Sequence, residues 1–134
     1  MDGGIGPGLI RPGSVFSVHL NFYTFLKEND ATSYDTYGIY GYSGGGQFVH
    51  RYALFTNPSR ASLIMSGASG WYTLPNYSES FPYGLNNSPF NENLLREKFM
   101  LPMIILVGEN DNNPNDSSLR KTSQAMRQGS HRLE

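Results

Sequence analysis

A serine stands between glycines in "GYSGG", from Gly41 to Gly45, where a strand-like apolar run gives way to helical spacing. The pattern G-x-S-x-G is typical of a serine nucleophile on a sharp strand-to-helix turn. Glycines two positions before and after the serine relieve the collisions that side chains would make there. Ser43 is therefore the candidate nucleophile, and the Gly44 amide, at the helix start, is the candidate oxyanion donor. The competing interpretation is a structural glycine-rich loop.

A nucleophilic serine needs a base that takes its proton and an acid that orients the base. Asp111 follows the apolar run "MIILVG", at the carboxyl end of a predicted strand, where ligands bind in parallel sheets. Asp111 is therefore the candidate acid, and an Asx turn in this asparagine-rich loop is the alternative. Glu109 is a weaker candidate because it lies too close to the strand, and Asp116 because it is placed as a helix N-cap.

The base is harder to find, because the chain has three histidines and none follows a further strand. His19 precedes Ser43 on a predicted helix. His50 lies two helical turns after Ser43, on a helix surface or between helices. His131 follows Asp111 but lies close to the last residue, so it is a disfavoured candidate for the base.

The elements that must position these residues alternate along the chain. Helical spacing covers 15–29, 45–55, 91–99 and a segment from about residue 117, and strand-like runs cover 36–42, 61–68 and 103–109. This order predicts an α/β fold, with a parallel sheet of three or four strands and helices on both faces. Residues 1–14, rich in glycine and proline, are expected to be a loop or a disordered tail of a single domain spanning 1–134.

Composition excludes several functional classes. The formal net charge is -1 and no run of lysine or arginine forms a phosphate-binding patch, so nucleic acid is not an expected partner. No apolar segment reaches the roughly 18 to 20 residues that span a bilayer, and the start of the chain lacks a secretory signal, so a cytoplasmic location without membrane contact is expected. There is no cysteine and no cluster of ligating residues, so neither a metal nor a cofactor is expected.

Four segments in one order carry a family resemblance: "GYSGGGQFVHRYALF", "SGASGWYTLP", "FPYGL" and "VGENDNNPNDSSLRKTSQAMRQGSHRLE". From about Thr36 to Glu134 the chain resembles the α/β-hydrolase superfamily, in particular a bacterial branch of esterase-like and polyhydroxyalkanoate-depolymerase-like hydrolases. The resemblance implies that Ser43 is the nucleophile, Gly44 the oxyanion amide and Asp111 the acid. It also implies that His131 is not the base.

The same resemblance implies that parts of the fold are missing from this chain. These are the strands before the first helix, a second oxyanion loop and the segment with the catalytic histidine, which would follow Glu134. The sequence therefore predicts a partial α/β-hydrolase fold. It predicts a serine hydrolase of esters or related acyl compounds, whose histidine comes from elsewhere. A catalytically inactive, truncated hydrolase-fold protein that acts as a binding or oligomerisation module is the alternative.

Two further expectations concern the surroundings of the candidate site. Aromatic residues near it are candidates for lining a small-molecule ester pocket, and packing of a long loop is the alternative for each: Tyr42, Trp71, Tyr72, Phe81 and Tyr83. The strand that leads to Ser43 would have one bare edge, which a second copy or a partner chain would cover.

Overall fold

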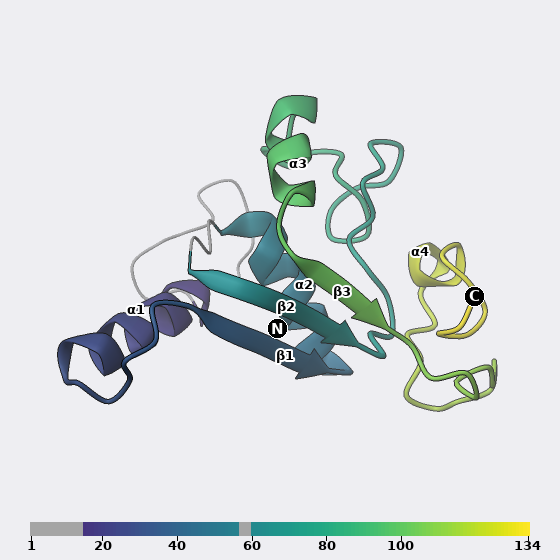
Figure 1. Ribbon diagram of the computed structural model, residues 1–134. Coiled ribbons are helices and arrows are strands. Elements are labelled where there is room, and N and C mark those ends of the chain that lie inside the picture. Colours follow the sequence, from purple (N-terminus) through teal and green to yellow (C-terminus); the bar gives the residue numbers. More distant parts are fainter. Residues whose placement is uncertain (1–14, 57–59) are drawn as a thin grey trace.

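The computed structural model describes residues 15–56 and 60–134 (Figure 1). The expected tail at 1–14 lies outside the described residues. The described elements follow in the order α1 (Val15–Glu28), β1 (Tyr37–Tyr42), α2 (Gly44–Phe55), β2 (Ala61–Gly67), α3 (Glu92–Phe99), β3 (Met103–Leu106) and α4 (Ser123–Met126). This is the order predicted from the sequence. None of the described helices is long and apolar enough to cross a membrane.

The three strands form one parallel sheet in the order β1-β2-β3. Helix α2 makes the crossover from β1 to β2, and the second crossover contains α3. Because the strands are parallel, their carboxyl ends share one edge of the sheet. That edge carries Ser43 after β1, Ala68 after β2 and the loop from Val107 after β3.

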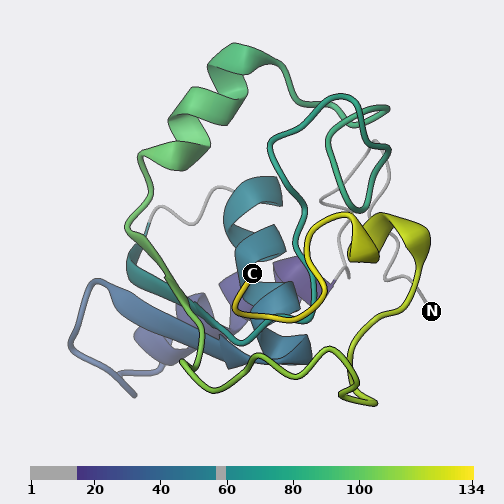
Figure 2. The same ribbon diagram turned by 90° about the vertical axis from the view of Figure 1, so that its right-hand side faces the viewer.

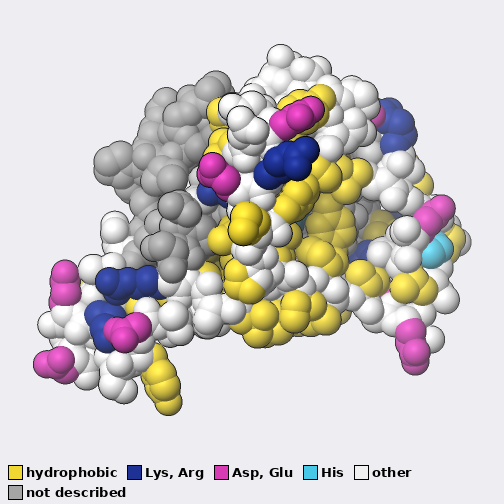
Figure 3. Space-filling view, turned by 45° about the horizontal axis from the view of Figure 1, so that its top comes forward, with side chains coloured by type: hydrophobic (Ala, Val, Ile, Leu, Met, Phe, Trp, Pro, Cys, Tyr) yellow, Lys and Arg dark blue, Asp and Glu magenta, His cyan; other side chains and the backbone are white. Residues whose placement is uncertain are grey.

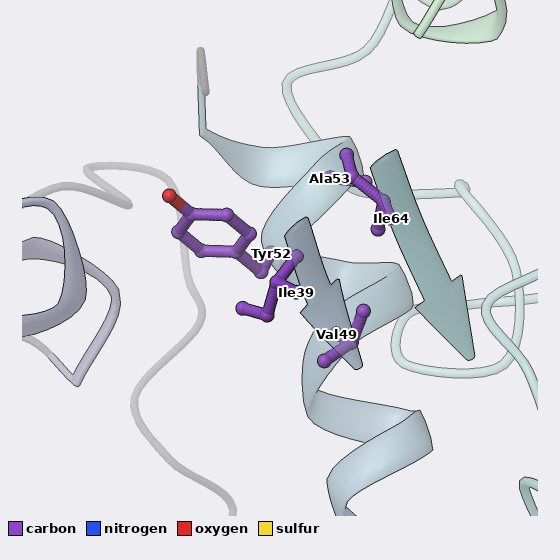
Figure 4. Packing of buried hydrophobic residues seen from close by; sticks show 5 residues of the cluster. All are labelled: Ile39, Val49, Tyr52, Ala53 and Ile64. Atoms are coloured by element: carbon purple, nitrogen blue, oxygen red, sulfur yellow. The ribbon is translucent and has the colours of Figure 1, made fainter. Parts of the chain in front are cut away.

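The main core lies between α2 and the sheet. Figure 4 shows its five central side chains, from α2 and from strands β1 and β2: Ile39, Val49, Tyr52, Ala53 and Ile64. Each is less than 10% exposed. Burial of a side chain the size of valine or isoleucine stabilises a fold by about 1.5–3 kcal/mol. This packing therefore holds β1 and α2, the two elements on either side of Ser43, in a fixed relationship.

A second cluster binds the long loop after β2 to the helices. Leu54 and Phe55 of α2 pack with Leu85 and Phe90 of the loop and with Leu95 of α3. Phe55 meets the ring of Phe90 edge to face, with a centroid distance of 5.0 Å. The loop is therefore packed onto the domain core, as its aromatic content suggests.

The two faces of the sheet differ. Helix α2 covers one face, whereas no described helix covers the other (Figures 1 and 2). The expectation of helices on both faces is thus met on one face only within the described residues. The uncovered face, called the bare face below, carries alternate residues of the three strands. Leu63 and Met65 of the central strand are half-buried there, and the side chains of the outer strands are exposed: Tyr40, Tyr42, Ile104 and Leu106.

The last predicted helix is much shorter than expected. It begins at Ser123 and not near residue 117, and the side chain of Thr122 caps it by accepting from the Ala125 amide. Asp116 is therefore not a helix N-cap. Its carboxylate instead accepts hydrogen bonds from the amide and the hydroxyl of Ser118, at 2.8 and 2.7 Å, which folds this segment into a turn.

Candidate active site

Ser43 lies in a strained turn between the end of β1 and the start of α2. Its φ is 55° and its ψ is -114°, a conformation that costs a residue with a side chain about 1–3 kcal/mol. The Ser43 amide donates to the carbonyl of Gly67 at 2.8 Å, so the turn is fastened to β2. The hydroxyl makes no hydrogen bond to the described residues and is half-buried. The surrounding packing thus holds an unpaired hydroxyl at the carboxyl edge of the sheet.

The glycines around Ser43 are not equivalent. A Cβ atom on Gly41 would lie 2.1 Å from the carbonyl oxygen of Gly45 and 2.8 Å from a methyl group of Val49, so the strand and the helix meet closely there. A Cβ atom on Gly45 would meet nothing within 4 Å, so the steric reason expected for Gly45 is wrong. The close approach on the helix side is at Gly46, where a Cβ atom would lie 2.6 Å from both the Gly67 carbonyl oxygen and Ser69 Oγ.

The helix that starts after Ser43 presents backbone amides at the same edge. Gly44 is exposed and is the first residue of α2. Amides in the first turn of a helix lack carbonyl partners within the helix, and the helix dipole favours negative charge near them. The Gly44 amide is thus placed where an anion next to Ser43 would find a donor.

Asp111 follows β3 and lies at the same edge as Ser43. Both residues line one hollow of about 580 Å³, together with Tyr42 of the bare face. The Asp111 amide donates to the Gly108 carbonyl at 3.0 Å, which turns the chain just after the strand. One carboxylate oxygen, Oδ1, accepts from Arg132 Nη1 at 2.9 Å. The fold therefore brings the candidate nucleophile and the candidate acid to the same hollow.

His50 is a buried structural residue, 2% exposed. Its Nδ1 lies 3.1 Å from the Gly46 carbonyl oxygen, and its Nε2 accepts from the Thr73 amide at 3.1 Å. Since an amide can only donate, Nε2 is unprotonated and Nδ1 carries the proton. Burial, with a smaller effect of neighbouring Arg51, lowers the pKa of His50 to about 3. His50 is therefore neutral and has no nitrogen left for catalysis.

His131 also lies apart from the Ser43 hollow. It lines a neighbouring hollow of about 310 Å³, together with Trp71 and Tyr72. Its Nδ1 is buried without a hydrogen-bond partner among the described residues. Neither described histidine side chain lines the hollow of Ser43 and Asp111.

Four of the five aromatic candidates for lining the substrate pocket do not line the Ser43 hollow either: Trp71, Tyr72, Phe81 and Tyr83. The guanidinium of Arg51 lies 4.0 Å from the ring centroid of Trp71, which also packs against Tyr83 at 4.5 Å. The backbone of Tyr72 pairs with the Gln128 side chain through two hydrogen bonds of 2.8 Å. These contacts hold the loop against α2 and the C-terminal segment. Of the five candidates, only Tyr42 lines the Ser43 hollow.

Arg132 is the site residue that sequence reasoning missed. Its side chain is 8% exposed and lines the Ser43 hollow, where it pairs with Asp111 and with Asp116. The arginine lies 21 and 16 residues from these partners, so no local spacing rule would have paired them. Within 15–56 and 60–134, no group of three or more acidic or histidine side chains is placed to hold a metal ion.

Solved structures of similar fold include a hydrolase and a depolymerase. The poly(aspartic acid) hydrolase-1 from Sphingomonas sp. KT-1 is 35% identical with a TM-score of 0.87, over 98% of this chain and 51% of the hydrolase. The poly(3-hydroxybutyrate) depolymerase LpqC from Bordetella parapertussis is 29% identical with a TM-score of 0.80, over 90% of this chain and 40% of the depolymerase. The chain thus spans about half the length of these relatives. No family model and no curated protein sequence matches it.

Both relatives are α/β-hydrolase-like, so the resemblance inferred from the sequence is confirmed. The three-stranded parallel sheet with its flanking helices agrees with a partial fold of that class.

Proposed function

We propose that this chain, which has part of the α/β-hydrolase fold, provides the nucleophile, one oxyanion donor and the acid of a serine hydrolase. The observation that supports this proposal is that Ser43, in a turn with positive φ, and Asp111, after β3, line one hollow at the carboxyl edge of the sheet. A free hydroxyl in a rigid turn beside helix amides suits acyl transfer.

In the proposed reaction, Ser43 Oγ attacks the acyl carbon of an ester while a histidine takes the hydroxyl proton. The Gly44 amide donates to the oxyanion that forms on the former carbonyl oxygen. The carbon–oxygen bond to the alcohol then breaks, and the histidine returns the proton to the leaving alcohol. Attack by water on the acyl-serine releases the acid and restores the hydroxyl.

The histidine in this scheme comes from polypeptide other than the described residues at this hollow: a further segment of the protein, a second copy or a partner chain. Within the described residues, His50 has both nitrogens engaged and His131 lines a different hollow. Serine without a base is a poor nucleophile at neutral pH, so a chain without such a partner should lose about 10³-fold or more in the chemical step.

The proposed substrate is a small ester or a short polyester segment. The hollow at Ser43 has a volume of about 580 Å³, which falls within the range of small-molecule sites, roughly 300–1,000 Å³. The names of the two relatives suggest the comparison to make: short oligomers of 3-hydroxybutyrate against short oligomers of aspartic acid.

The test combines a fluorophosphonate probe with hydrolysis of a p-nitrophenyl ester, with and without added imidazole as an external base. In the wild type we expect covalent labelling and a turnover with imidazole that exceeds the rate of free imidazole, and in Ser43→Ala we expect neither. Free imidazole cleaves activated esters slowly, so the rate with Ser43→Ala is subtracted. Ser33→Ala, at an exposed serine that does not line the Ser43 hollow, is the matched control and should behave as the wild type.

Equal inertness of the wild type and Ser43→Ala, with and without imidazole, would overturn the proposed activity. It would leave the inactive binding or oligomerisation module as the explanation. The hydrolase relatives do not favour that alternative.

A further inference from the structure

Arg132 is enclosed by the loop that carries the candidate acid. Its Nη1 donates to Asp111 Oδ1 at 2.9 Å and to Asp116 Oδ2 at 3.1 Å, and its Nη2 donates to Ser118 Oγ at 2.6 Å. The arginine side chain is 8% exposed, against 23% for Asp111 and 34% for Asp116. A buried cation is stable only when hydrogen-bonded anions or hydroxyls replace its hydration, so these three partners hold the guanidinium in one place.

The residue after Arg132 contacts the same aspartate through the backbone. The Leu133 amide donates to the Asp111 carbonyl at 3.2 Å, and the Asp111 amide donates to Gly108. Asp111 is therefore fixed at its amide, its carbonyl and one carboxylate oxygen. Without the arginine, the carboxyl group would retain rotation about χ2, a broad and weakly restricted torsion.

The segment that carries Arg132 is itself anchored. The Gln128 side chain accepts a hydrogen bond from the Tyr72 amide and donates one to the Tyr72 carbonyl. Arg127 pairs with Glu79 through two nitrogens, at 2.6 and 2.7 Å. Near the end of the described chain, the Ser130 amide donates to Glu134 Oε2 at 2.6 Å. Arg132 thus projects from a docked segment toward the loop after β3.

The second carboxylate oxygen of Asp111, Oδ2, has no hydrogen bond within the described part of the chain. A triad acid needs an oxygen of this kind, because it accepts the Nδ1–H of the histidine and holds the ring in the productive tautomer. We propose that Arg132 is a positioning residue of the hydrolase. Arg132 binds Oδ1 of Asp111 and so leaves Oδ2 oriented for an incoming imidazole. This inference rests on the proposed function of Ser43 and Asp111.

Imidazole itself is the probe for the test. The Ser43-dependent ester turnover is measured over a series of imidazole concentrations for the wild type, Arg132→Gln, Arg132→Lys, Asp111→Asn and the double variant Arg132→Gln/Asp111→Asn. We expect Arg132→Gln to lower the turnover at a given imidazole concentration by up to about 100-fold, as expected for a misplaced catalytic group. Arg132→Lys should recover part of the loss, since lysine can reach one oxygen as a point charge.

The double variant separates positioning from a merely structural role. If Arg132 acts through Asp111, Arg132→Gln has no further effect once Asp111→Asn is present, and the two losses are not additive. Arg96→Gln, at an exposed arginine of α3 that lines no part of the Ser43 hollow, is the matched control and should retain wild-type turnover per folded molecule. Circular dichroism gives the folded fraction for each variant.

The results separate failure of the positioning role from failure of the proposed function. Unchanged turnover in Arg132→Gln, or additive losses in the double variant, would overturn the positioning role while the hydrolase proposal stands. A wild type that shows no Ser43-dependent turnover at any imidazole concentration would overturn the proposed function and this inference with it.

Discussion

Nε2 of His50 accepts a hydrogen bond of 3.1 Å from the backbone amide of Thr73, which joins α2 to the loop after β2. The other ring nitrogen lies beside the Gly46 carbonyl, in the first turn of the same helix. The neutral imidazole therefore links the helix that follows Ser43 to the loop that contains Trp71 and Tyr72. A protonated imidazole would place a second N–H against the Thr73 amide and lose that link.

The first prediction is a pH dependence of stability that His50 causes. Burial lowers the pKa of His50 to about 3, whereas an unfolded histidine titrates near about 6.5, so protons bind more readily to the unfolded chain. The stabilisation by neutral His50 is complete above about pH 6.5 and is lost as the pH falls toward 3. The loss should approach about 1.4 kcal/mol per pH unit in this window, and no more than about 5 kcal/mol in all.

The measurement is urea unfolding at several pH values between 7 and 4 for the wild type and His50→Gln. Glutamine can present a neutral acceptor to the Thr73 amide but does not titrate, so the variant should be less stable at pH 7 and show a flatter pH dependence. Other titrating groups are common to both proteins and cancel in the difference. Parallel curves for the two proteins would contradict the prediction.

A second prediction concerns the unequal glycines of the Ser43 turn. Gly41→Ala would force a Cβ atom to 2.1 Å from a backbone oxygen, which only a shift of β1 against α2 can relieve. We expect a loss of more than about 3 kcal/mol in the free energy of unfolding, together with loss of fluorophosphonate labelling. Gly46→Ala should behave similarly, since its Cβ atom would meet the Gly67 carbonyl oxygen.

Gly45→Ala is the matched control for those two variants, because a Cβ atom there meets nothing within 4 Å. Alanine is a better helix former than glycine, so this variant should be as stable as the wild type or more stable, by up to about 1 kcal/mol. Chemical denaturation measures the free energy of unfolding of the three variants. A Gly45→Ala protein as unstable as Gly41→Ala would show that the packing of the turn differs from that described.

A third prediction concerns acid and the turn beside Arg132. Hydrogen bonds from the Ser118 amide and hydroxyl, and then from Arg132, lower the pKa of Asp116 to about 2. A lowered carboxyl pKa stabilises the fold above the unfolded value, near about 3.9, and that stabilisation is lost as the pH falls toward 2. Ser118→Ala removes one of these donors. It should lower the thermal midpoint at pH 7 and have little effect near pH 2; an equal decrease at both pH values would exclude an ionised Asp116 as the cause.

The elements that position Ser43 could be predicted from local sequence, because their signals are local. Alternation in "YGIYGY" gives β1 within one residue of its observed start, and the helical spacing of Phe48, Tyr52 and Phe55 gives α2. Because a predicted strand ends before Ser43 and a predicted helix starts after it, the sequence also predicts the turn at Ser43. The order of elements likewise follows from the sequence, and with it the shared edge of Ser43 and Asp111.

The parts that could not be predicted depend on contacts distant in sequence. The helix expected from about residue 117 is replaced by a turn, in which Asp116 bonds Ser118 and the distant Arg132. Trp71 was expected near the site because it is aromatic and in a loop, but the guanidinium of Arg51 and the ring of Tyr83 determine its position. Local periodicity contains no information about such partners.

The last prediction concerns the bare face of the sheet. Tyr40 and Ile104 are 55% and 45% exposed, and both flank Met65 across the three strands. Hydrophobic side chains gather over the strands in the middle of Figure 3, while most charged side chains lie around them. Strand β1 also pairs on one side only among the described residues, and an unpaired apolar edge favours association. We therefore expect the isolated chain to associate with a second copy or a partner through this region.

Sedimentation over a range of protein concentrations measures that association. A lysine in an apolar contact must lose its hydration, so Tyr40→Lys and Ile104→Lys should each raise the dissociation constant by about 10-fold or more, the equivalent of about 1.4 kcal/mol. Met100→Lys is the matched control, since Met100 is 86% exposed but lies outside the sheet, and it should associate as the wild type does. A wild type that remains a stable monomer at all concentrations would contradict self-association. If all three substitutions weakened association equally, the cause would be the added charge and not contact through the bare face. Tyr40 and Ile104 lie on that face, whereas Met100 does not.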